Sequence, residues 1–157
     1  MWDFTQEELA AHEEWLASNG AKGTKIDKTG RDLTGTKHPG ANLAGAHFIG
    51  TRFNDGDYAG AVFAGADFSG ARLEKTNLKG ANLRGADLGG CTLDGANLKG
   101  ADISDCDCSG ATFINADLTD VTAENIDFVA ANLTGAKTDG IKISGNARLN
   151  DAIGFNG

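Results

Sequence analysis

Proline and large side chains are scarce in this chain of 157 residues. It contains one proline, one methionine and two tryptophans, and aromatic residues make up only 7% of it. A core built mainly from large side chains is therefore thin. Yet hydrophobic residues make up 40% and the mean hydropathy is -0.28, which is too apolar for a disordered chain. The length and composition predict a folded protein of one domain, or at most two small ones.

Long apolar runs and a recognisable leader are also missing. No stretch approaches the roughly 18 apolar residues of a membrane span, so we expect no membrane partner. The start, MWDFTQEELAAHEE, is acidic and lacks an apolar segment, which argues against a secretory signal. The three cysteines, Cys91, Cys106 and Cys108, match neither a zinc-binding spacing nor a disulfide framework. These absences predict a cytoplasmic protein whose thiols fill the core.

An excess of positive charge is lacking as well. The net charge is -8 and the isoelectric point is near 4.7, which disfavours direct nucleic-acid binding. The charge is unevenly spread, because residues 22–52 sum to +4 while residues 101–136 carry seven acids and no Lys or Arg. This acidic block suits a basic partner.

Glycine and alanine are abundant instead, with 23 and 24 residues. Both follow a period of five that runs without insertion over residues 41–145, beginning ANLAG, AHFIG, TRFND, GDYAG, AVFAG. Among these 21 units, the third position is apolar in 20, the first is Ala in 13 and the fifth is Gly in 14. The units RDLTG and TKHPG extend the register back to residue 31.

A five-residue period fits neither a helix nor a long strand. It predicts a short extended segment followed by a turn. The first and third residues then point inward, as alternate residues of a strand do, and the second points outward. Glycine at the fifth position accepts the backbone angles of the turn.

This A(D/N)LXX pattern resembles the pentapeptide-repeat family over residues 31–145. The resemblance implies an all-β solenoid, a right-handed quadrilateral β-helix whose coils stack at about 4.8 Å. Large inward side chains then recur every 20 residues in four core columns. The predicted members are Leu43, Phe48, Phe53, Tyr58, Phe63, Phe68, Leu73, Leu78, Leu83, Leu88, Leu93 and Leu98.

The N-terminal segment has the features of a helical cap. Thr5 and Glu8 match a capping box, and Phe4 with Leu9 matches a hydrophobic staple. We expect a helix to about Asn19, with Gly20 ending it. One face of this helix is expected to lie on the first coil, and its members are Leu9, His12, Trp15 and Leu16.

The C-terminal segment leaves the repeat. The register slips by one residue, with Ala147 and Leu149 inward, and Ile153 and Phe155 either cap the last coil or meet a second copy. By resemblance to family members related to quinolone resistance, the alternatives are a monomer or a homodimer at this end. We therefore divide the chain into a cap and lead-in (1–25), a β-helix (26–145) and a C-terminal cap or tail (146–157).

Catalytic chemistry has no visible site in this sequence. No Ser or Cys shares a repeat unit with a His, and the glycines lie at the turn positions of the repeat, unlike a phosphate-binding loop. We predict no catalytic residue, cofactor or metal. One outward column reads His47, Asp67, Asp87, Asp107 and Asp127. Its aspartates either repel one another, which would raise some of their pKa values, or hydrogen-bond the adjacent turn.

These acids define a candidate interaction face. Its members are Asp67, Asp87, Asp102, Asp105, Asp107, Asp117, Asp120, Glu124 and Asp127. The predicted function is a non-catalytic structural or protein-interaction module with an unknown protein partner, in a family that is commonest in bacteria. The alternative is an acidic DNA mimic, since several family members resemble duplex DNA and bind DNA gyrase in its place. A basic N-terminal section and the lack of a loop distinguish this chain from those members.

Overall fold

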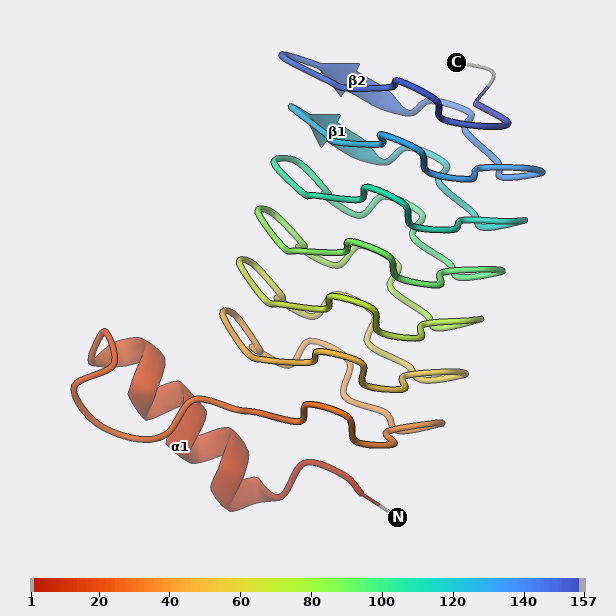
Figure 1. The fold of residues 1–157 in the computed structure, drawn as a ribbon. Helices are drawn as coiled ribbons and strands as arrows, with labels where there is room; N and C mark the ends of the chain where they lie inside the picture. Colours follow the sequence, from red (N-terminus) through yellow and green to blue (C-terminus); the bar gives the residue numbers. More distant parts are fainter. Residues whose placement is uncertain (1, 156–157) are drawn as a thin grey trace.

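The computed structural model describes residues 2–155, so Met1, Asn156 and Gly157 lie outside the described part of the chain. Helix α1 (Gln6–Ala17) comes first and is followed by a stack of coils that contains the two short strands β1 (Thr122–Glu124) and β2 (Lys142–Ser144). Figure 1 shows α1 beside the first coil at one end of the stack, with the C-terminal residues in the last coil at the opposite end.

The coils are held together by parallel backbone pairing, at an offset of 20 residues over most of the stack. Single bridges join residues such as Asp67 and Asp87, and β1 pairs with β2 at the same offset. Backbone N–H groups donate both to the next coil and to the previous one. The Phe68 N–H donates to the Asp87 carbonyl at 2.8 Å, and the Asp87 N–H donates to the Ala66 carbonyl at 3.0 Å. Four five-residue units therefore complete each coil, and the predicted β-helix is confirmed.

Each unit ends in a turn whose last residue has a left-handed backbone. Gly85 has a φ of +65°, and a Cβ placed there would meet nothing within 4 Å, so backbone conformation alone favours glycine. Asp and Asn replace glycine at several of these positions, as their tolerance of this region allows. Lys75 and Ala130 adopt the same left-handed conformation, with φ of +57° and +56°, although their side chains do not favour it as those of Asp and Asn do.

The core lies inside the coils. All twelve residues expected in the core columns are at most 1% exposed. Five aromatic rings form a continuous cluster in the N-terminal half, with neighbouring centroids 5.0–5.9 Å apart, namely Phe48, Phe53, Tyr58, Phe63 and Phe68. Alanines at the first positions are buried between them, which explains how so many small residues build a dense core.

The pairing offset changes from 20 to 21 residues near the C-terminus. Asp127 pairs with Arg148 and Asn132 with Ile153, so one extra residue enters the last coil. Asn146 follows the last regular unit, and its N–H donates to the Asn125 side chain at 2.9 Å. The predicted slip is confirmed. Ile153 occupies an outward position and is 59% exposed, whereas Phe155 packs against the core cluster.

Helix α1 begins as predicted and ends earlier. Thr5 accepts from the Glu8 N–H, and the Glu8 carboxylate accepts from the Thr5 N–H, so the capping box is confirmed. The last helical residue is Ala17 rather than Asn19. Asn19 itself takes the left-handed conformation (φ +51°), and the Gly20 N–H returns to the Trp15 carbonyl at 2.8 Å. This Schellman motif therefore uses Asn19, not Gly20, as its first left-handed residue.

Polar residues at inward positions of the first coil meet the N-terminal segment. Lys28 occupies a third position of the repeat and is buried, and its Nζ donates to the Glu8 carboxylate at 2.7 and 2.9 Å and to the Asp3 carbonyl at 3.0 Å. The Nε2 atom of His38 lies 2.6 Å from the Asp3 carboxylate. Phe4 packs edge-on against Phe48 beneath these contacts.

The helix also contacts the first coil through His12. This side chain is fully buried, and its Nδ1 accepts the Ile26 N–H at 3.1 Å. Leu9 packs against the core cluster beside it.

Candidate functional site

The outward second position of each unit stabilises its own turn. Carboxylates of Asp67, Asp87 and Asp107 accept the backbone N–H two residues further on, at 2.9, 2.8 and 2.8 Å. Asparagines make the same bond, as Asn97 does with the Lys99 N–H at 3.1 Å. Asp and Asn therefore recur at this position because both supply an acceptor oxygen at the right distance from the backbone.

Four of these aspartates form one continuous column. Asp67, Asp87, Asp107 and Asp127 are bridged in succession, so their side chains leave the same side of the solenoid one coil apart. Residues at the fourth positions of three of these units are small, being Ser69, Gly89 and Ser109. We call these four aspartates the acidic column. The result is a flat surface on which carboxylates alternate with short side chains.

Of the two alternatives for this column, hydrogen bonding to the adjacent turn holds at Asp107. Hydrogen bonds from the side chain and backbone of Ser109 lower the pKa of its carboxyl, more than partial burial raises it. The charge of Arg148 adds to this lowering. Turn hydrogen bonds therefore favour the ionised form of Asp107.

Arginines from outside the acidic block neutralise part of it. Arg84 lies one coil earlier and reaches Asp102 at 3.4 Å and Asp105 at 2.9 Å. Arg148 lies one coil later and reaches Asp127 at 2.6 Å. Burial would raise the pKa of Asp102, but hydrogen bonds from Ser104 and Arg84 lower it. Counting charges along the chain missed these pairs, because each arginine lies on a different coil from its acid.

The remaining acids of the candidate face lie apart. Asp117 pairs with Lys137 and Asn97 on another side of the solenoid, and hydrogen bonds from Thr119 lower its pKa. Asp120 is a left-handed turn residue, and Glu124 ends β1. The nine predicted residues therefore divide into the four of the acidic column, two beside Arg84 and three others.

Cofactor or metal chemistry finds no support in these surfaces. Within residues 2–155, no three His, Cys, Asp or Glu side chains cluster so that they could hold a metal ion. Burial raises the pKa values of Cys91 and Cys106 to about 12, and their thiols donate to the carbonyls of Phe68 and Leu83. The cysteines thus act as small core residues. Over the same described range, no helix is long and apolar enough to cross a membrane.

Comparison with known proteins identifies the repeat. The family model "Pentapeptide repeats" matches in eight copies that together span residues 32–142. No curated protein sequence matches the chain significantly.

Three solved structures illustrate the similarity. HetL, a pentapeptide repeat protein involved in heterocyst differentiation regulation in Nostoc sp. strain PCC 7120, is 28% identical, with a TM-score of 0.46 over 83% of this chain and 66% of HetL. Rfr23 from Cyanothece 51142 is 20% identical, with a TM-score of 0.49 over 81% of this chain and 90% of Rfr23. A form of QnrB1, a plasmid-mediated fluoroquinolone resistance protein, is 18% identical, with a TM-score of 0.48 over 79% of this chain and 74% of QnrB1. The chain thus spans just under two thirds of the length of HetL.

Proposed function

Because this chain belongs to the pentapeptide-repeat family, we propose that it is a non-catalytic interaction module that binds a protein partner. Members of the family fold as right-handed β-helices and generally serve structural or interaction roles. The three buried free thiols are consistent with a reducing, cytoplasmic compartment. We place the binding site on the outer surface of the solenoid, because side chains fill its inside.

The acidic column is the observation that carries this proposal. Its carboxylates are fixed by turn hydrogen bonds, and the small residues between them leave the surface flat. A surface ordered before binding loses little conformational entropy on association. Asp67, Asp87 and Asp107 make no ion pair within residues 2–155, so they are available to a basic partner surface.

The finer architecture belongs to the same proposal. Four bridges per 20 residues support a quadrilateral cross-section, and the contacts of Lys28, His38 and Phe4 support a capping role for the N-terminal segment. The boundaries 1–25, 26–145 and 146–157 follow from the first bridge at Asp27 and the register change near Asn146.

A pull-down with matched charge variants tests the acidic column. The triple substitution D67N/D87N/D107N removes three charges while Asn keeps the turn hydrogen bond, as Asn97 shows. The control D57N/D117N/D139N removes three charges from a different side of the solenoid. We expect a specific partner to be lost with the first variant and retained with the second. Equal retention or equal loss with both variants would refute a role for the column.

A DNA mimic is the second candidate, favoured by the acid surplus around the column. The column, Asp102, Asp105 and Glu124 together have seven carboxylates, and Arg84 and Arg148 leave five net negative charges. Four coils span about 14 Å. Duplex DNA carries about eight phosphate charges over that length. The charge density is therefore well below that of DNA, which ranks mimicry second.

A gyrase supercoiling assay separates the two candidates. A mimic of duplex DNA is expected to inhibit the enzyme, or to protect it from a poison, at micromolar concentration, and D67N/D87N/D107N should lose the effect. An unchanged supercoiling rate with the wild-type protein would reject gyrase as the target and leave the interaction module standing.

A further inference from the structure

Lys25 lies where the chain enters the first coil, and a histidine contacts its amine. The Nζ atom is 2.8 Å from Nε2 of His47, and Nδ1 of the same imidazole is 3.9 Å from Oδ2 of Asp27. With the lysine donating to Nε2, the imidazole proton lies on Nδ1 and faces the carboxylate. The three side chains form a sequence of amine, base and orienting carboxylate, the general geometry of an activated nucleophile.

The backbone fixes this arrangement. Asp27 and His47 are bridged across adjacent coils, with the His47 N–H donating to the Ile26 carbonyl at 3.0 Å. Asp27 also accepts the Thr29 N–H at 2.9 Å, which limits rotation of its carboxylate. The Trp15 ring lies on the other side of the amine, with its centroid 5.4 Å from Nζ. Lys25 is therefore held in place more firmly than a free surface lysine.

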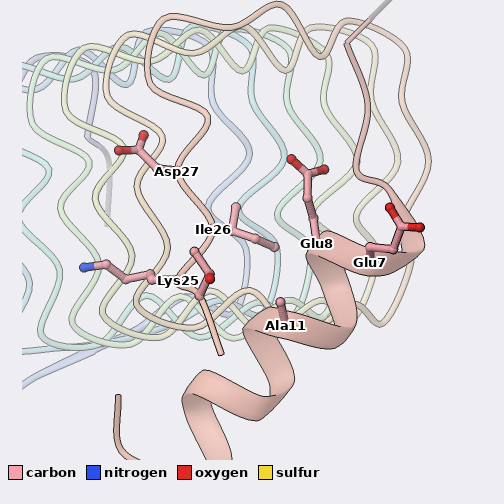
Figure 2. A pocket seen from close by; sticks show the side chains of 7 residues that line it. Glu7, Glu8, Ala11, Lys25, Ile26 and Asp27 are labelled. Atoms are coloured by element: carbon pink, nitrogen blue, oxygen red, sulfur yellow. The ribbon is translucent and has the colours of Figure 1, made fainter. Parts of the chain in front are cut away.

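A hollow of about 400 Å³ has Lys25 in its lining, with the Nζ atom directed away from α1. It lies between α1 and the first coil, and Figure 2 shows Lys25 and Asp27 at one side of it and Glu7 and Glu8 on α1 at the other. Ile26 and Ala11 supply apolar wall between them. The hollow offers an apolar surface beside the Lys25 side chain on which a short acyl chain can pack.

We propose that Lys25 is a site of covalent acylation by a neutral thioester. The Lys25 ammonium passes a proton to Nε2 of His47, and the Asp27 carboxylate, 3.9 Å from Nδ1, stabilises the imidazolium by its negative charge. The freed amine attacks the thioester carbonyl, so a C–N bond forms while the C–S bond breaks. The thiolate leaves and takes up a proton, and the lysine ends as an uncharged amide. No oxidant or second reactant is needed.

The charge around the hollow selects the class of acyl donor. Lys28 already neutralises Glu8, whereas no ion pair within residues 2–155 involves Glu7. Together with Asp27 this leaves the walls negative, which disfavours an anionic donor such as an acyl phosphate. A small, uncharged thioester meets no such repulsion.

Residue-resolved acetylation tests the proposal. The full-length protein is treated with S-acetyl-N-acetylcysteamine, and the modification rate of each lysine is read by peptide mass spectrometry. We expect Lys25 to react at least tenfold faster than Lys79 and Lys99, which are exposed and have no histidine contact. In H47Q, the rate at Lys25 should fall to that of these lysines, and in D27N it should fall part of the way.

Matched measurements keep the outcome decisive. His47 and Asp27 are outward, solvent-accessible residues, and unchanged thermal melting of both variants shows that the fold is intact. Acetyl phosphate should show no preference for Lys25 over Lys99. The proposal is overturned if Lys25 reacts no faster than Lys79 and Lys99, or if H47Q reacts at Lys25 as fast as wild type. A preference for acetyl phosphate at Lys25 would overturn the assigned donor class.

Discussion

At the scale of single residues, the backbone angle of the turn explains most of the glycine. The fifth position requires a left-handed conformation, which costs a residue with a Cβ atom roughly 1–2 kcal/mol. Ala130 bears this cost, since its φ is +56°. Gly110 occupies the equivalent turn one coil earlier, with φ of +65° and open space around it.

Replacing Ala130 with glycine should therefore stabilise the protein. We expect Ala130→Gly to raise the free energy of unfolding by about 1 kcal/mol, as measured by urea denaturation. Gly110→Ala is the matched reverse change and should lower it by a similar amount. Equal stability of the two variants would contradict the argument from backbone conformation.

Replacing an inward leucine with a charge should unfold the stack. Leu83 is fully buried, so Leu83→Asp places an unpaired carboxylate in the core, and we expect a loss of about 4 kcal/mol or more. The neighbouring Asn82→Asp adds the same charge at an outward position and keeps the turn acceptor for Arg84. Circular dichroism melting should show a cooperative transition for Asn82→Asp only. Cooperative melting of a soluble L83D protein would mean that Leu83 does not face inward.

The repeat predicted which residues face inward, but it could not predict the ion pairs. Burial of Leu83 and exposure of its neighbours follow from the alternation of extended backbone alone. The contact of Arg84 with Asp105 depends on a long side chain crossing to the next coil, which requires both the 20-residue register and a particular rotamer. The lowered pKa of Asp107 likewise depends on the Ser109 hydrogen bonds, which the sequence analysis offered only as one of two alternatives.

At the scale of elements, α1 is attached mainly through polar contacts. Both tryptophans, Trp2 and Trp15, lie in the N-terminal segment, so their fluorescence reports on this attachment. Glu8 has a lowered pKa, because hydrogen bonds from Lys28 and Thr5 outweigh the effect of burial. A carboxyl whose pKa is lower in the folded state contributes stability above its unfolded value, and this is lost as the pH falls through the folded value.

Acidification should therefore loosen α1. We expect the tryptophan fluorescence to change as the pH falls below the ordinary Glu value of 4.5. Glu8→Gln keeps an acceptor for the capping box and removes the charge, so this variant should lose most of that change. Identical titrations of the two proteins would contradict the role of the Lys28–Glu8 pair.

The start of α1 was predictable from sequence and its end was not. Thr5 and Glu8 form a local pattern that needs no tertiary contact. The helix ends at Ala17 because Asn19, which precedes Gly20, already takes the left-handed conformation. Both residues can adopt this conformation, so the sequence did not show which of them ends the helix. The ion pair of Lys28 was also not predicted, because its partner Glu8 lies 20 residues away on a different element.

At the scale of the whole molecule, the two ends of the solenoid differ. Helix α1 and its ionic contacts lie at the N-terminal end, whereas the last coil has an exposed Ile153 and, within residues 2–155, no further coil paired to its outer edge. Leu149 and Phe155 are only partly buried against the core there. An exposed edge of this kind is a template for pairing with another chain.

Light scattering after gel filtration tests association at this end. We expect a concentration-dependent homodimer, and Ile153→Lys should shift it to monomer because a charge enters the apolar contact. Ile49→Lys, at an exposed position near the opposite end, is the control and should leave the dimer intact. A protein that stays monomeric at high concentration would refute association through this edge.

The charged residues buried in the first coil also set a limit on assembly. Lys28 and His38 occupy positions that hold apolar side chains in later coils, and Asp3 and Glu8 supply their partners. A second copy stacking at this end would have to displace Asp3 and Glu8, which would leave the Lys28 ammonium without a partner in an apolar contact. Stacking through this end is therefore disfavoured, which limits head-to-tail growth of the rod.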